Sequence, residues 1–145
     1  MASEENQQTT NEQIQETDQS SLSSMTIVFS DIKSYTQMSK SLHSSKLKSL
    51  LDTYLHEMTL IIERYEGTID KIMGDGILAL FNNTFAPEEH AKNAVEAALD
   101  MQTASGVLRR EWQKLSGSMN LQVRIGVASG EVVLSDSKAS SRKKG

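Results

Sequence analysis

The stretch DKIMGDGILALF, residues 70–81, restricts the possible folds of this chain more than any other segment. Two short runs rich in β-forming residues, TIDKIM and ILALF, flank a GDG triplet, a spacing that predicts an antiparallel hairpin. Glycine tolerates the backbone conformations that a tight turn demands. The turn therefore places a lone carboxylate, Asp75, at the tip of the hairpin, between Gly74 and Gly76.

A long helical pattern precedes the hairpin. From Ser45 to Tyr65 apolar residues recur at steps of three and four, which is typical of an amphipathic helix. Ser44 or Ser45 is the expected N-terminal cap. Gly67 stands where a glycine commonly ends a helix.

A second helix is predicted after the hairpin, with Pro87 and two glutamates in its first turn, and it extends past Gly106 to Leu115. Its small-residue face allows close packing on a sheet and consists of Ala91, Ala94, Val95, Ala98 and Gln102. We expect Trp112 to serve in packing. His43, His56 and His90 lack metal-ligand spacing and are expected to have surface or packing roles.

Strands are predicted before the first helix and after the second. MTIVFSDI (25–32) reads as a buried strand, and LQVRIGVAS and GEVVLS read as two strands with a turn at SG. The order β-α-β-β-α-β is that of the split βαβ, or ferredoxin-like, pattern. We therefore expect an α+β sandwich with an antiparallel sheet and its helices on one face.

Composition sets the limits of this domain. Residues 1–24 contain only two large aliphatic residues after Met1, too few to offset the entropy of ordering, so a disordered segment or linker is expected there. Residues 135–145 read as a disordered tail. A net charge of −4 without a basic stripe argues against nucleic acid, and the absence of cysteine excludes a cysteine-based zinc site. No membrane segment is evident, so we expect a cytoplasmic protein or a cytoplasmic domain of a larger one.

Two aspartates, Asp31 and Asp75, are candidate functional residues. Asp31 ends the strand 25–32, which the split βαβ pattern places beside the hairpin, so Asp31 and Asp75 should be neighbours. Two close carboxylates repel unless a cation lies between them, and Mg²⁺ or Mn²⁺ suits oxygen ligands. The alternatives are structural, since GDG is a common turn and an aspartate at a strand end is often only a helix cap.

The loop after Asp31 supplies the predicted phosphate site. The backbone N–H groups of Ser34, Tyr35 and Thr36 would project from a helix N-terminus, where phosphates bind readily. Lys33 and Gly74 complete the predicted set, Gly74 because it lets a phosphate approach the backbone. The sequence thus predicts a metal–nucleotide site.

Four blocks in order resemble the class III nucleotidyl cyclase catalytic domain, the adenylate and guanylate cyclase homology domain. They are VFSDIKSYTQMSKSL, YEGTIDKIMGDGILALF, EEHAKNAVEAALDMQ and LQVRIGVASGEVV. The resemblance implies a partial cyclase domain over residues 25–134, with the ferredoxin-like core already inferred. It also implies conversion of ATP to 3′,5′-cyclic AMP and pyrophosphate by attack of the ribose 3′-oxygen on the α-phosphate.

The resemblance assigns roles to individual residues. Asp31 and Asp75 match the family's metal-binding aspartates, with the Ile32 carbonyl as a further ligand for two Mg²⁺ or Mn²⁺ ions. Lys71 matches the family's base-reading lysine, and a lysine there favours ATP over GTP. The site forms where two domains pair head to tail, so a homodimer or a second cyclase domain is implied as partner.

The sequence also departs from the family pattern. The segment LSDSKASSRKKG carries neither the second base-reading residue nor the asparagine and arginine that stabilise the transition state. We therefore expect a C-terminally truncated domain with very low activity alone. A catalytically dead binding or dimerisation module and a guanylate cyclase remain alternatives. A GGDEF-type diguanylate cyclase is disfavoured, because GDG lacks that family's signature loop.

Overall fold

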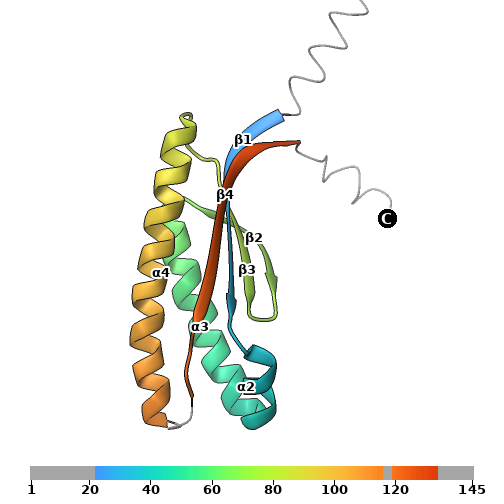
Figure 1. Ribbon diagram of the computed structural model, residues 1–145, viewed down its shortest axis with the longest axis vertical. Helices are drawn as coiled ribbons and strands as arrows, with labels where there is room; N and C mark the ends of the chain where they lie inside the picture. Colours follow the sequence, from blue (N-terminus) through green and yellow to red (C-terminus); the bar gives the residue numbers. More distant parts are fainter. Residues whose placement is uncertain (1–21, 116–118, 134–145) are drawn as a thin grey trace, which may run out of the picture. The chain divides into compact units, whose positions relative to one another are not determined.

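The computed structural model describes residues 22–115 and 119–133 (Figure 1). Met25–Ser129 form one compact unit, while 22–24 and 130–133, the outer ends of two strands, belong to a second unit. The elements, in chain order, are β1 (Leu22–Ile32), α2 (Tyr35–Ser41), α3 (Ser44–Arg64), β2 (Thr68–Met73), β3 (Gly76–Phe81), α4 (Pro87–Leu115) and β4 (Val123–Val133).

The strands form one sheet in the order β2-β3-β1-β4. β3 pairs antiparallel with both β2 and β1, and the β2–β3 register shifts between Ile69 and Lys71, which marks a bulge. This strand order is that of the ferredoxin-like fold, so the predicted α+β architecture and the 70–81 hairpin are confirmed.

β1 and β4 are also antiparallel. The Lys33 amide donates to the Gln122 carbonyl over 2.8 Å, and near the far end of the pair the Thr26 and Ser129 hydroxyls lie 2.6 Å apart. Residue numbers thus rise along β1 while they fall along β4. This register decides which β4 side chain stands opposite each side chain of β1.

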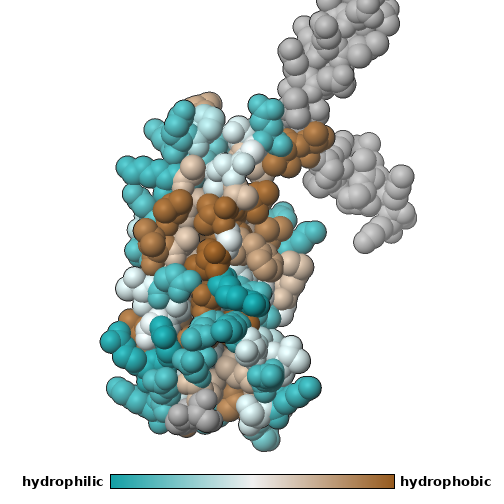
Figure 2. Space-filling model, viewed as in Figure 1, coloured by the Kyte–Doolittle hydropathy of each residue, from teal (hydrophilic) through white to brown (hydrophobic). Residues whose placement is uncertain are grey.

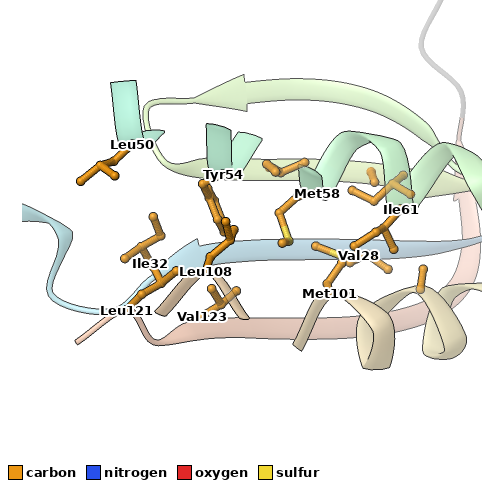
Figure 3. Packing of buried hydrophobic residues seen from close by; sticks show 14 of the residues in the cluster. Val28, Ile32, Leu50, Tyr54, Met58, Ile61, Met101, Leu108, Leu121 and Val123 are labelled. Atoms are coloured by element: carbon orange, nitrogen blue, oxygen red, sulfur yellow. The ribbon is translucent and has the colours of Figure 1, made fainter. Parts of the chain in front are cut away.

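The core lies between the sheet and the two long helices. In Figure 3, side chains from α3 and α4 meet those of β1 and β4 on one side of the sheet. The labelled members are Val28, Ile32, Leu50, Tyr54, Met58, Ile61, Met101, Leu108, Leu121 and Val123. Trp112 is buried among them, as predicted. Burial of this apolar surface against the helices is the main stabilising contribution to the fold.

Alternation along β1 separates two faces of the sheet. Val28, Ser30 and Ile32 are buried on the side of α3 and α4, whereas Phe29 between them is 39% exposed. Side chains alternate between faces along a strand, so Phe29 belongs to the opposite face. We call this side, away from α3 and α4, the open face.

Both ends of α3 differ from the prediction. The N-cap is His43, whose side chain accepts a hydrogen bond from the Ser45 amide, so neither Ser44 nor Ser45 is the cap. At the other end Glu66, not Gly67, adopts the left-handed conformation, with φ 68°. Gly67 is needed for space instead, because a Cβ there would stand 2.6 Å from the Phe81 ring and 2.7 Å from Ile62.

Two strand predictions were also wrong. β1 begins at Leu22, so 22–24 are extended strand residues and not part of a disordered segment; residues 1–21 and the predicted tail lie outside the described ranges. The predicted turn at SG does not form, because β4 continues from Val123 to Val133 without a break. The backbone at Gly130 shows no positive φ, so nothing there reverses the chain.

The helix α4 matches the predicted length, but its buried face is rotated. Val95 is 47% exposed, while His90, Ala97 and Met101 are buried on the core side. The small residue Ala94 was placed correctly. Along the described part of the chain, α3 and α4 included, we found no helix apolar enough over sufficient length to cross a bilayer.

Candidate metal–nucleotide site

The hairpin turn fixes Asp75 against the end of β1. Gly74 adopts a φ of 62°, which glycine reaches without a steric penalty. The turn lets the Asp75 carboxylate accept a hydrogen bond from the Ile32 amide at 2.8 Å. The structure therefore brings the hairpin tip to the residue that follows Asp31, as the topology argument expected.

A cavity of about 330 Å³ opens at this place. Its lining residues are Asp31, Ile32, Ser34, Tyr35, Thr36, Gln37, Asp75 and Arg124. Six of the nine residues predicted for the site thus surround one cavity. Lys33 does not line it and faces a neighbouring cavity, and neither Gly74 nor Lys71 contributes to its wall.

Arg124 is the site residue that the sequence analysis missed. Its guanidinium donates hydrogen bonds to both carboxylate oxygens of Asp31, from Nε to Oδ1 at 2.8 Å and from Nη2 to Oδ2 at 2.9 Å. This carboxylate raises the pKa of Arg124 further above its ordinary value. The β-α-β-β-α-β order puts β4 beside β1, but only the observed register shows that Arg124 stands beside Asp31.

Tyr54 is a core residue close enough to the two acids for their charges to act on its hydroxyl. Its hydroxyl is buried near the Ser30 hydroxyl, although the two do not meet hydrogen-bond geometry and neither has another partner within the described structure. Burial raises the pKa of Tyr54 to about 12; the Ser30 hydroxyl opposes this rise, and the charges of Asp75 and Asp31 add to it. The helical pattern identified Tyr54 only as a core residue.

Lys71 lies on the open face at some distance from the cavity. It pairs with Leu78 across β2–β3, and Leu78 pairs with Phe29 across β3–β1, so the three side chains form one row. Asp31 shares this face, because it is two residues from Phe29 on the same strand. Two strand spacings separate β2 from β1, so the Lys71 and Asp31 backbones stand on the order of 10 Å apart.

The donors at the cavity suit a hard divalent cation held together with a ligand. Within the described ranges no group of three or more His, Cys, Asp or Glu residues could hold a metal ion. Mg²⁺ is commonly bound by one or two carboxylates plus substrate phosphates, which is what Asp31 and Asp75 could offer. The contact with the Arg124 guanidinium shows that the Asp31 carboxylate is already paired with a positive charge.

Comparison with known proteins identifies the family of this fold. The chain belongs to the adenylate and guanylate cyclase catalytic domain family, whose pattern matches residues 17–142. An adenylate cyclase of Anabaena cylindrica is 35% identical over 113 residues, which are 76% of this chain and 22% of that protein. The resemblance inferred from the four sequence blocks is thereby confirmed.

Solved structures of both cyclase kinds are similar. The adenylyl cyclase CyaB from P. aeruginosa has a TM-score of 0.73 and 34% identity over 76% of this chain and 57% of that one. The guanylyl cyclase Cya2 has a TM-score of 0.71 and 32% identity over 81% of this chain and 60% of that one. The chain thus spans about three fifths of these structures.

Proposed function

We propose that this chain supplies the metal-binding part of an adenylate cyclase site, which converts ATP to 3′,5′-cyclic AMP and pyrophosphate. The observation that carries the proposal is the bond from the Ile32 amide to Asp75, which holds two carboxylates at one cavity. Membership of the cyclase family supports the reaction class, and relatives of both nucleotide specificities leave the base to be argued separately.

Each residue has a distinct part in this proposal. Asp31, Asp75 and the Ile32 carbonyl would hold two Mg²⁺ or Mn²⁺ ions, and Asp75 is oriented for this by its bond to the Ile32 amide. When bound, the ions would favour ionisation of the ribose 3′-hydroxyl and stabilise charge on the leaving pyrophosphate. Ser34 and Tyr35 line the same cavity, so their amides are candidate donors to phosphate oxygens.

Thr36, Lys33 and Gly74 are proposed for the same phosphate role. Thr36 lines the cavity and offers both an amide and a hydroxyl. Lys33 and Gly74 are sequence neighbours of residues in the cavity wall, and a long lysine side chain can reach a phosphate from an adjacent position as a point charge. These three are expected to contribute less than the residues that line the wall beside the acids.

The proposal that the substrate is ATP and not GTP depends on Lys71. A lysine ammonium donates hydrogen bonds and can pair with an acceptor such as adenine N1. Lys71 is distant from the cavity of its own chain. This is expected for a residue that recognises the base of a nucleotide bound to a second domain. We therefore propose a homodimer, or a pair with another cyclase domain, joined through the open face, with Lys71 of one copy serving the site of the other.

The surface is consistent with such a pairing. Phe29 is exposed on the open face, and Met73, which pairs with Gly76 on the same face, is about half exposed at the hairpin end. Figure 2 shows apolar side chains over the middle of α4 and over the neighbouring strands, with hydrophilic side chains above and below them. An apolar centre with a polar rim is typical of surfaces that bind other proteins.

Calorimetry with Mn²⁺ and a non-hydrolysable ATP analogue tests the proposal. Asp31→Asn and Asp75→Asn should each weaken binding at least about tenfold, because the carboxylate charge is lost while the side-chain shape is kept. Asp52→Asn on the exposed face of α3 is the matched control, and it should leave binding unchanged. Equal affinity in all three variants would contradict the assignment of the site.

A second candidate function is a binding or dimerisation module without turnover. The Asp31–Arg124 ion pair favours it, since a carboxylate with a permanent counter-ion needs no metal. Under that alternative the nucleotide analogue would bind equally well with and without Mn²⁺. Metal-dependent binding that requires Asp31 and Asp75 would exclude it.

A further inference from the structure

The fork between Arg124 and Asp31 uses both oxygens of a carboxylate proposed as a metal ligand. The two contacts are short and parallel, 2.8 and 2.9 Å, which is the geometry of a bidentate pair. Both residues line the same cavity as Asp75. A cation that binds Asp31 must therefore share this carboxylate with the guanidinium or displace it.

The register between β1 and β4 brings Arg124 and Asp31 together. The Lys33–Gln122 and Thr26–Ser129 contacts fix the register on either side of it. That register puts Arg124 directly across from Asp31 on the neighbouring strand. Opposite side chains on paired strands are within interaction distance, so the contact needs no special arrangement of a loop.

Arg124 and Asp31 differ in how freely their side chains can move. The side chain of Arg124 is 62% exposed, while that of Asp31 is 28% exposed. A long exposed side chain can swing into solvent at little cost, whereas the shorter, more buried carboxylate has fewer places to go. If the pair opens, Arg124 is the residue that moves.

We propose that Arg124 is the resident counter-ion of the metal-free site: it neutralises Asp31 and is displaced when a divalent cation binds. The inference rests on the proposed metal role of Asp31. Arg124 is thus a competitor for the metal, and it offsets the repulsion between Asp31 and Asp75 when no metal is present. Loss of this arginine should make the empty site more avid for divalent cations.

Titration with Mn²⁺ alone, followed by the electron paramagnetic resonance signal of free Mn²⁺, measures this competition. Arg124→Gln should tighten Mn²⁺ binding roughly two- to five-fold, the range expected for removal of one exposed ion pair. Arg124→Lys keeps the charge without the fork and should fall between the two. Arg110→Gln, on an exposed position of α4, removes the same charge elsewhere and should leave the affinity unchanged.

The unmodified chain gives a second readout. In ¹⁵N spectra, the Nε–H of Arg124 should exchange slowly with water while it is bonded to Asp31 and rapidly after Mg²⁺ is added. Unchanged exchange at saturating Mg²⁺ would overturn the inference, as would unchanged or weaker Mn²⁺ binding by Arg124→Gln. If Asp31→Asn weakens Mn²⁺ binding while Arg124→Gln does not tighten it, only the inference fails. If Asp31→Asn has no effect on Mn²⁺ binding, the proposed metal site itself fails.

Discussion

The amide of Ile32 donates a 2.8 Å hydrogen bond to the Asp75 carboxylate, across 43 residues of sequence. One side chain thereby ties the tip of the β2–β3 hairpin to the end of β1. The bond has a structural role and also orients a carboxylate proposed for metal binding. Substitutions at Asp75 can separate these two roles.

Asp75→Ala should destabilise the fold by about 1.5–3 kcal/mol, the range for loss of a hydrogen bond to a charged group. Asp75→Asn should cost less, because the amide oxygen can still accept from Ile32, yet it should lose metal-dependent nucleotide binding as fully as alanine does. Urea unfolding and calorimetry on both variants test this separation. Equal stability of the two variants would show that the Ile32 bond contributes little.

Lys71→Glu should reverse the preference between ATP and GTP analogues, since a carboxylate accepts hydrogen bonds where lysine donates them. Competition binding with Mn²⁺ measures the ratio of the two affinities. Lys48→Glu, on an exposed position of α3, makes the same charge change away from the sheet and should leave the ratio unchanged. Full ATP preference in Lys71→Glu would make Lys71 an ordinary surface lysine.

Stability should fall at high pH because of Tyr54. Its pKa is raised to about 12 in the folded protein from 10.0, so its contribution is complete below pH 10 and is lost as the pH rises toward 12. The loss should approach about 2–3 kcal/mol at about 1.4 kcal/mol per unit. Tyr54→Phe should remove this pH dependence and cost little at neutral pH. Denaturant unfolding between pH 8 and 12 compares the two proteins, and parallel curves would contradict the prediction.

Gly67→Ala should destabilise the protein by about 1–3 kcal/mol, because the new methyl group would overlap Phe81 and Ile62 in the core. Gly126→Ala is the control, since a Cβ there meets nothing within 4 Å. Thermal unfolding of both variants measures the difference. A Gly67→Ala protein as stable as the control would mean that the core yields easily at this point.

Self-association should depend on Phe29. Light scattering should show a dimer for the unmodified chain, and Phe29→Lys should shift it toward monomer by placing a charge in the centre of the open face. Leu99→Lys puts the same charge on an exposed position of α4 and should not change the mass. A clean monomer before any substitution would refute pairing through this face.

The sequence was most informative where periodicity or glycine spacing leaves few choices. The hairpin, both long helices and the meeting of Asp31 with Asp75 followed from period, turn chemistry and topology. The unbroken course of β4 could not be predicted, because a glycine permits a turn without requiring one. The Asp31–Arg124 pair depends on strand register, which no local pattern in VRIG reveals. Its role in metal binding, like that of Lys71 in base recognition, stays a prediction.

The bulge in β2 has a consequence for behaviour at high concentration. β2 is the last strand at one end of the described sheet, and such an edge can recruit a strand from another molecule and seed amyloid-like growth. The register shift between Ile69 and Lys71 twists this edge, and Asp70 and Lys71 place opposite charges along it. Partners should therefore meet this chain across the sheet surface, and concentrated solutions should resist fibril formation from the β2 side.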